Sequence, residues 1–182
     1  MTINGIDTEQ VAGFAQLMTA EPALADVTVR TRHRWEGAYT LDSCGAGITV
    51  GGDVLARDEQ HLVSDRPALF GGDDRGCVPG ELLLAALSSC VGSQLVEHAA
   101  LRGVELSGLQ LSAEARVDLR GTLAIEGVPV GLHDVTLDVE VDSTAVDDEL
   151  DDLLELAART SPVAATLGAG VGVRTSLRRT TR

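Results

Sequence analysis

The chain has 182 residues, and its 28 acidic against 14 basic side chains give a formal net charge of −14. This charge would repel phosphate backbones and anionic lipid headgroups, so it argues against nucleic acid and membrane partners. A single domain of this length buries about 70% of its unfolded surface, so it needs neither a disulfide nor a metal for stability.

The three cysteines are an odd number without CxxC spacing, and the first residues, MTINGIDTEQ, lack the basic and apolar regions of a signal peptide. No apolar run is expected to reach the length that crosses a bilayer. These features predict a cytoplasmic protein.

Residues 1–26 are predicted to form an N-terminal helical extension. Asp7 or Thr8 can cap a helix that carries Val11, Phe14 and Leu17 and ends before Pro22. A strand is expected from Val27 to Trp35, followed by short strands. The glycines around positions 37, 45–47 and 51–52 are expected to form the hairpin turns between them.

The segment PGELLLAALSSC, residues 79–90, opens a predicted helix that starts near Pro79 and stops at Gly103. Its apolar residues recur at i, i+4 spacing, which predicts one continuous apolar face that contains Cys90 and a helix buried on most of its circumference. Glu81 lies in the first turn, where the helix dipole favours a carboxylate.

Two later segments alternate between apolar and charged residues, at 109–119 and 135–141, and predict strands of a sheet with one buried face. The helix around Cys90 is the expected cover. A helix with an acidic start follows from Asp147 to Arg159, and its acidic cluster is interpreted as a solvated helix start rather than a metal site. Ser161 is expected to cap a short helix, and Val171, Val173 and Leu177 to form a final strand before a tail at 179–182.

The string GGDDRGCVPGELLLAALSSCVGSQL, preceded by HRWEGAY and followed by RTSPVAATL, resembles the OsmC/Ohr family of osmotically inducible and organic-hydroperoxide-resistance proteins. The resemblance extends over residues 27–178, the predicted OsmC-like domain. It implies an α+β fold with antiparallel sheets packed on a long central helix, in an intertwined homodimer with active sites between subunits.

In this family the cysteine of the matching helix attacks the peroxide, and a second cysteine resolves the sulfenic acid. Cys90 matches the first, whereas position 161 is Ser, so the chain resembles a divergent member without the second cysteine. The family's Glu directly follows the proline, whereas here Gly80 follows Pro79 and Glu81 comes next. The family's Arg lies beyond the first-strand turn, whereas here Arg32 and Arg34 precede it.

The predicted catalytic residues are therefore Cys90, Glu81 and Arg34, and Arg32, Arg75 and Arg120 are the other arginines that could approach the thiol. Glu81 lies nine residues from Cys90, about 13 Å along a helix, so it would act through an arginine, of the same subunit or of a second one. The alternatives are that Cys90 is a small buried hydrophobe and that Glu81 only stabilises its helix.

Two further side chains are considered. Cys77 could act as a resolving thiol only if its loop folded back or a second subunit supplied it, because a disulfide needs α-carbons within about 7 Å. His98, eight residues after Cys90, is interpreted as a hydrogen-bonded core or interface residue rather than a base.

The predicted function is thiol-dependent reduction of organic hydroperoxides in oxidative-stress defence, with an external thiol as reductant and no cofactor or metal. The alternative is a non-catalytic protein that binds a small apolar ligand at the dimer interface.

Overall fold

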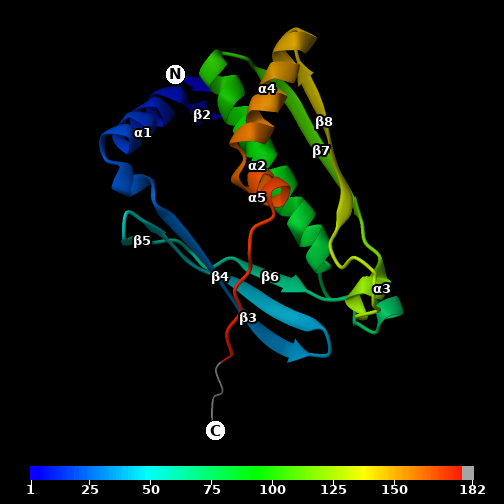
Figure 1. Cartoon of the computed structure of the whole chain (residues 1–182). Helices are drawn as coiled ribbons and strands as arrows, with labels where there is room; N and C mark the ends of the chain where they lie inside the picture. The colour runs from blue at the N-terminus through cyan, green and yellow to red at the C-terminus, as the bar shows by residue number, and fades with distance from the viewer. Residues whose placement is uncertain (178–182) are drawn as a thin grey trace.

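The computed structural model describes residues 1–177 and has an α+β architecture. A long helix, α2 (Pro79–Arg102), runs through the centre, and antiparallel sheets lie on either side of it in sequence (Figure 1). The predicted fold class is confirmed.

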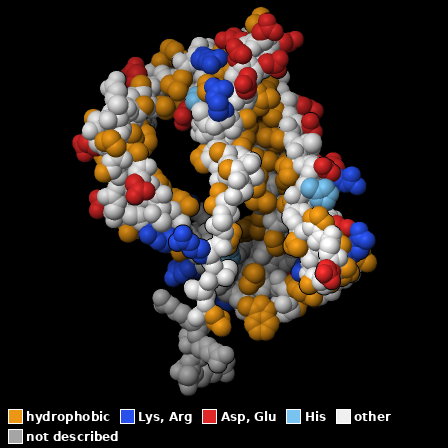
Figure 2. Space-filling model, in the orientation of Figure 1, with side chains coloured by type: hydrophobic (Ala, Val, Ile, Leu, Met, Phe, Trp, Pro, Cys, Tyr) orange, Lys and Arg blue, Asp and Glu red, His pale blue; other side chains and the backbone are white. Residues whose placement is uncertain are grey.

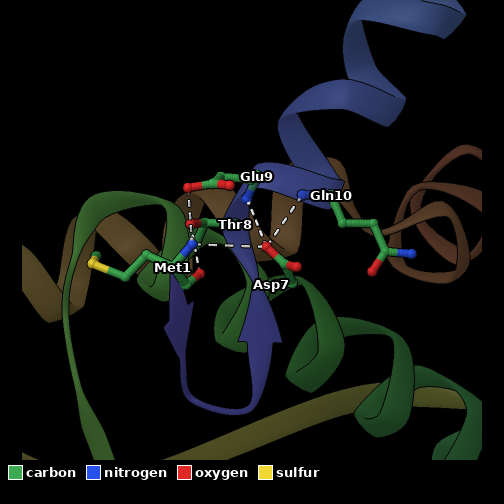
Figure 3. Close-up of polar contacts among 5 residues, drawn as sticks. All are labelled: Met1, Asp7, Thr8, Glu9 and Gln10. Atoms are coloured by element: carbon green, nitrogen blue, oxygen red, sulfur yellow. Dashed lines mark hydrogen bonds and ion pairs between the residues drawn. The ribbon is translucent and has the colours of Figure 1, made fainter.

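The N-terminal segment forms a small hairpin and a helix, as the capping pattern predicts. β1 (Thr2–Ile3) pairs with β2 (Ile6–Asp7), and α1 (Thr8–Ala20) follows directly, then the 3-10 turn η1 (Pro22–Ala25). Asp7 caps α1 by accepting hydrogen bonds from the backbone N–H groups of Glu9, at 3.0 Å, and Gln10, at 3.3 Å (Figure 3). α1 contains no buried residue, so the chain itself leaves its apolar side chains uncovered, and Figure 2 shows apolar side chains on the surface in this part of the molecule.

The first large sheet is built on β4 (Thr40–Val50), which pairs on one side with β3 (Val27–Gly37) and on the other with β5 (Asp53–Leu55) and β6 (His61–Ser64). The expected turns at Gly37 and at Gly51 to Gly52 are present. The expected turn at residues 45–47 is wrong, because these residues continue β4. A register shift opposite Val29 and Thr31 absorbs the extra residue, and Gly47 takes φ 106° within the strand.

The second sheet pairs β7 (Leu106–Arg116) with β8 (His133–Ser143). Both predicted alternating segments are thus antiparallel strands, although Val117 follows the end of β7 and Leu119 begins the short helix α3 (Leu119–Thr122). α2 packs on β7 and on α4 (Asp147–Thr160), and α5 (Pro162–Ala169) closes this layer. The helix is the cover that the sequence predicts.

The hydrophobic core belongs to this second half of the chain. Its buried members come from α2, α4 and the residue after Gly103, namely Leu87, Val91, Leu95, Ala99, Val104, Leu153 and Ala157. Gly103 ends α2 in the left-handed region, at φ 78°. Leu109, Leu137 and Val141 of the sheet pack against this cluster from below.

Two expectations about α2 differ from what the single chain shows. The chain by itself does not bury most of the circumference of α2, since it buries only 28% of the helix's most apolar stretch, and burial by a second copy stays a prediction. The helix is also long and apolar enough, by length and composition alone, to cross a membrane, although core helices of globular proteins meet the same criterion. Its packing against α4 and β7 is that of a core helix.

The final strand predicted from Val171, Val173 and Leu177 is also absent from the described residues. Residues 171–177 have no regular secondary structure, and all three side chains are exposed. Alternation gives a segment the ability to form a strand, but the strand forms only where a free sheet edge accepts it. The predicted tail at 179–182 and the end of the predicted domain at 178 lie outside the described residues, and the boundary at residue 26 stays a prediction.

Candidate functional site

Cys90 occupies the middle of α2, and its side chain is partly exposed. An α-helix has 3.6 residues per turn, so residues seven or eleven positions apart lie on the same side. Cys90 therefore shares a side of α2 with Leu83 and Leu101, and this side lies away from Leu95 and Ala99. Leu83 is 37% exposed and Leu101 is 44% exposed. The prediction that Cys90 lies on an apolar face is therefore met in part by a second stripe, defined by Leu83, Cys90 and Leu101, and not by the face that the chain buries. Gln94 and Glu97 lie on the same side of the helix and interrupt this stripe between Cys90 and Leu101.

Glu81 takes part in the start of α2. Its Oε2 accepts a hydrogen bond from the backbone N–H of Val78 at 2.9 Å, which satisfies one of the free donors at the helix N-terminus. This contact is the structural role that the sequence allowed as the alternative. The predicted role of Glu81 in orienting an arginine stays a prediction.

Arg34 lies on β3 and lines a cavity of about 320 Å³ that contains neither Cys90 nor Glu81. The structure therefore does not bring the three predicted catalytic residues together in one cavity of a single chain. The thiol that shares the cavity with Arg34 is Cys44.

Of the other candidate arginines, Arg32 and Arg120 have side-chain partners of their own, and Arg75 contributes a backbone contact. Arg32 donates to Glu59 Oε1 at 3.1 Å. Arg120 binds Asp118, and hydrogen bonds from the Arg120 side chain and backbone lower the pKa of Asp118 to about 2. Arg75 contributes its backbone N–H to Asp65 at 3.2 Å. None of these contacts involves Cys90.

The two faces of the first sheet differ in chemistry. By the strand register, Arg32 and Arg34 project to the same face as Asp42 and Cys44, the polar face. Trp35, Leu41 and Leu62 project to the opposite, apolar face and are all exposed. An apolar stripe such as that of Leu83, Cys90 and Leu101 would pack against the apolar face.

Ser161 confirms the predicted helix cap. Its side chain is fully buried, and its Oγ accepts a hydrogen bond from the backbone N–H of Ala164 at 3.2 Å. Beside it, His98 Nε2 makes a 2.9 Å hydrogen bond with Thr160 Oγ1, which ties α2 to the end of α4. His98 is the hydrogen-bonded residue that the sequence predicts.

Cys77 is exposed, and its segment does not fold back along α2. It forms a parallel bridge with Ser64 at the end of β6, and its carbonyl accepts a hydrogen bond from the N–H of Asp65 at 3.2 Å. All three cysteines are free thiols. Within one chain, Cys77 therefore cannot resolve Cys90.

Asp65 fixes the loop that carries Cys77 to the start of α2. Its buried carboxylate accepts hydrogen bonds from the Thr40 hydroxyl and from the backbone N–H groups of Arg66, Asp73 and Arg75. Burial by itself raises the pKa of Asp65, but these hydrogen bonds to the charged form lower it overall. The carboxylate thus serves as the polar core of the loop.

A second cavity, of about 620 Å³, lies on the flank of α2 next to the Cys90 stripe. Its apolar lining comes from Ile6, Val96, Leu109 and Leu111. Its polar lining comes from α2 and consists of Ser88, Ser89, Ser93 and the carboxylate residue Glu97. Gly92 lets β7 approach closely, because a Cβ there would lie 3.2 Å from Leu111 Cδ1. In residues 1–177, no three His, Cys, Asp or Glu side chains are arranged to hold a metal ion.

The cavity of Cys44 and Arg34 was not predicted from the sequence. The signal that could have found it is the run Arg30, Arg32, Arg34, which places three guanidinium groups on one face of a strand. The run does not predict that Arg32 pairs with Cys44, or that Cys44 pairs with His61, because both pairings depend on strand register.

Together, the fold and the site define a class: α+β proteins in which antiparallel sheets accompany one long helix that presents a partly exposed thiol. The family model described as OsmC-like protein matches residues 71–176, which is more than half of the chain. The chain belongs to the OsmC-like family, as the sequence predicts.

Solved structures support the same fold. An OsmC-like protein from Mycoplasma pneumoniae aligns with a TM-score of 0.59 at 15% identity, covering 80% of this chain and 89% of the other. An organic hydroperoxide resistance protein from Elizabethkingia anophelis aligns with a TM-score of 0.56 at 21% identity, covering 78% and 89%. An organic hydroperoxide resistance protein OsmC from Legionella pneumophila aligns with a TM-score of 0.52 at 15% identity, covering 77% and 88%. A search of curated proteins found no match.

Proposed function

We propose that this protein reduces organic hydroperoxides in oxidative-stress defence, with Cys90 as its single peroxide-attacking residue. The observation that carries the proposal is the position of Cys90, a partly exposed thiol on an apolar stripe in the middle of α2. A thiol in the chain's own core would be inert, whereas this one is accessible. The family supports the proposal, since two similar structures carry the name organic hydroperoxide resistance protein.

We further propose that the active unit is a homodimer in the cytoplasm. Two apolar surfaces of the chain lack a cover: the stripe of Leu83, Cys90 and Leu101, and the apolar sheet face of Trp35, Leu41 and Leu62. Exposed apolar patches of this kind favour association. A second copy that packs its sheet face on the stripe would surround the thiol with apolar side chains and favour organic hydroperoxides over hydrogen peroxide.

In the proposed reaction, the Cys90 thiolate attacks the distal oxygen of the hydroperoxide. The O–O bond breaks, the alkoxide leaves and takes a proton to become the alcohol, and Cys90 becomes a sulfenic acid. Ser161 cannot form a disulfide with it. An external thiol therefore attacks the sulfenic sulfur, water leaves, and a second thiol releases Cys90 and the oxidised reductant.

Arg34 and Glu81 complete the proposal as the groups that hold and polarise the peroxide. Because Arg34 shares no cavity with Cys90 in one chain, it would have to come from the second copy. Arg34 lies on the polar sheet face, and the variant Arg34→Gln tests its role separately from that of Cys90.

The experiment measures consumption of tert-butyl hydroperoxide with a dithiol as reductant, together with the rate of Cys90 alkylation against pH. We expect Cys90→Ser to abolish consumption and Cys77→Ser, at an exposed thiol outside the stripe, to leave it unchanged. An alkylation rate that titrates near or above about 8.5, the ordinary thiol value, with turnover retained in Cys90→Ser, would show that the protein is not a peroxidase of this kind.

The cavity of about 620 Å³ favours one second candidate, a non-catalytic protein that binds a small apolar ligand. Its apolar lining, with three serines and Glu97 as the polar residues, fits a small apolar molecule with one polar end that can donate hydrogen bonds. An environment-sensitive apolar dye distinguishes the two functions. If the dye binds and Leu111→Ser weakens it, while no peroxide is consumed, the binding function is the correct one.

A further inference from the structure

The polar face of the first sheet brings a thiol, a guanidinium group and an imidazole into one row. By register, Cys44 of β4 lies directly opposite Arg32 of β3 on one side and His61 of β6 on the other. Directly opposite residues of antiparallel strands have Cβ atoms about 4.5–5.5 Å apart. The next row on the same face places Arg34 opposite Asp42.

These side chains line the cavity of about 320 Å³ described above, with Glu59 and His33 at its border. Cys44 is partly buried within it. The cavity lies on the opposite sheet face from Trp35 and Leu41, the side chains proposed to cover Cys90. It therefore lies apart from the Cys90 stripe, and among its side chains only Arg34 also has a proposed role in the peroxidase reaction.

The charges in the cavity leave one guanidinium group free. Arg32 is paired with Glu59 at 3.1 Å. His61 lies between two carboxylates, with Nδ1 at 3.6 Å from Asp42 and Nε2 at 3.7 Å from Glu59. Asp42 is thus directed to His61 and not to Arg34, which has no ion pair within residues 1–177.

His33 adds no free donor, because its two ring nitrogens face the hydroxyl groups of Ser43, at 2.6 Å, and Thr31, at 3.0 Å. The group that remains to bind an incoming anion is therefore Arg34. Guanidinium groups bind carboxylates in a fork geometry that also orients the bound molecule.

We propose that Cys44 is a second modification site, which forms a mixed disulfide with small disulfides that carry carboxylate groups. Arg34 holds a carboxylate of the incoming disulfide, and the thiol proton passes to the solvent. The Cys44 thiolate attacks one sulfur, a Cys44–S–S–R bond forms, the original S–S bond breaks, and the other half leaves as a thiolate. Cys44 is oxidised, and the departing sulfur is reduced.

The test uses the full chain with Cys44 as its one cysteine, prepared as Cys77→Ser with Cys90→Ser. Two probe disulfides are compared at low ionic strength: the dianion 5,5′-dithiobis(2-nitrobenzoate) and the uncharged 2,2′-dithiodipyridine. We expect Arg34→Gln to lower the rate of reaction with the dianion by about three- to five-fold, which is the effect of one charge at about 5 Å in a solvated site. The rate of reaction with the uncharged probe should stay unchanged.

Arg30→Gln is the matched control. Arg30 belongs to the same strand, but its Nη1 hydrogen-bonds Thr49 Oγ1 at 2.6 Å, and it does not line the cavity. It should change neither rate.

Two results would overturn the proposal. The first is that Arg34→Gln and Arg30→Gln have equal effects. The second is that the ratio of the rate with the dianion to the rate with the uncharged probe is no higher for Cys44 than for the exposed Cys77. If the double variant does not fold, the wild-type chain is treated with less than one equivalent of the dianion and digested with trypsin. Cys44 then lies in the peptide 35–57, and the other two cysteines lie in 76–102. Modification confined to 76–102 rejects the proposal.

Discussion

The two sheets of this chain have the same alternation of apolar and polar residues, yet only one of them has a cover. β7 and β8 bury Leu109, Leu137 and Val141 under α2 and α4. Along β3, by contrast, every residue but the last is exposed, and the buried core contains no member from β3 to β6. Alternation predicts that one face of a sheet is buried, but it does not predict which element, or which copy of the chain, covers that face.

The largest expected effect comes from the covered half. Leu153 of α4 is fully buried in the core cluster, so Leu153→Ala should lower the free energy of unfolding by about 2–5 kcal/mol through lost burial and the cavity left behind. Urea denaturation followed by circular dichroism measures it. A loss below about 1 kcal/mol would show that this half is not the stable core.

A smaller loss is expected from Asp65→Asn, at the loop that joins the two halves. The amide group cannot accept all the hydrogen bonds that the buried carboxylate accepts from Thr40 and three backbone N–H groups. Because the folded-state pKa of Asp65 is lowered, its stabilisation is present above the unfolded value of about 3.9 and is lost as the pH falls through the folded value.

The measurement for Asp65 is the urea midpoint of both proteins between about pH 7 and about pH 3. The difference between wild type and Asp65→Asn should be largest at the upper end and should shrink on acidification. A difference that stays constant over this range would mean that the charge of Asp65 does not support the loop.

Ser161→Ala should remove about 1 kcal/mol, the usual cost of losing a helix N-cap. The N–H of Ala164 would lose its acceptor in a buried position. Thr166→Ala is the matched control, because its exposed hydroxyl only donates back to the Pro162 carbonyl within α5. Equal effects of the two changes in thermal unfolding would contradict the capping role.

The smallest effect on an isolated chain is expected from Leu62→Ala on the open sheet, whose side chain is 45% exposed. At low protein concentration the loss should stay below about 0.5 kcal/mol. If a second copy covers the apolar face, the loss should grow with protein concentration, because association stabilises the folded state by mass action. A small loss at every concentration would mean that the open sheet stays open.

Much of the fold could be predicted from local chemistry. Pro79 and Gly103 set the ends of α2, Asp7 and Ser161 cap their helices, and the alternation in β7 and β8 marks their buried face. Each of these signals acts within a few residues of chain, where steric limits and hydrogen bonds of the backbone decide the conformation.

The failed expectations depend on distant neighbours. Gly45 to Gly47 look like a turn but continue β4, because Gly45 pairs with Thr31 and the register shift before Ile48 takes up the extra residue within the strand. Val171 and Val173 alternate like a strand but find no sheet edge to pair with. The side of α2 to which Cys90 belongs could not be read from a helix that is apolar around most of its circumference.

The sequence by itself determined the family, the central helix and the identity of its thiol, because the motif PGELLLAALSSC combines a helix start, an apolar pattern and Cys90 in one continuous segment. Only the tertiary structure decided that Cys90 faces away from the chain's own core and that Arg34 shares a cavity with Cys44. Both depend on helix packing and strand register, which join residues that are far apart in the chain.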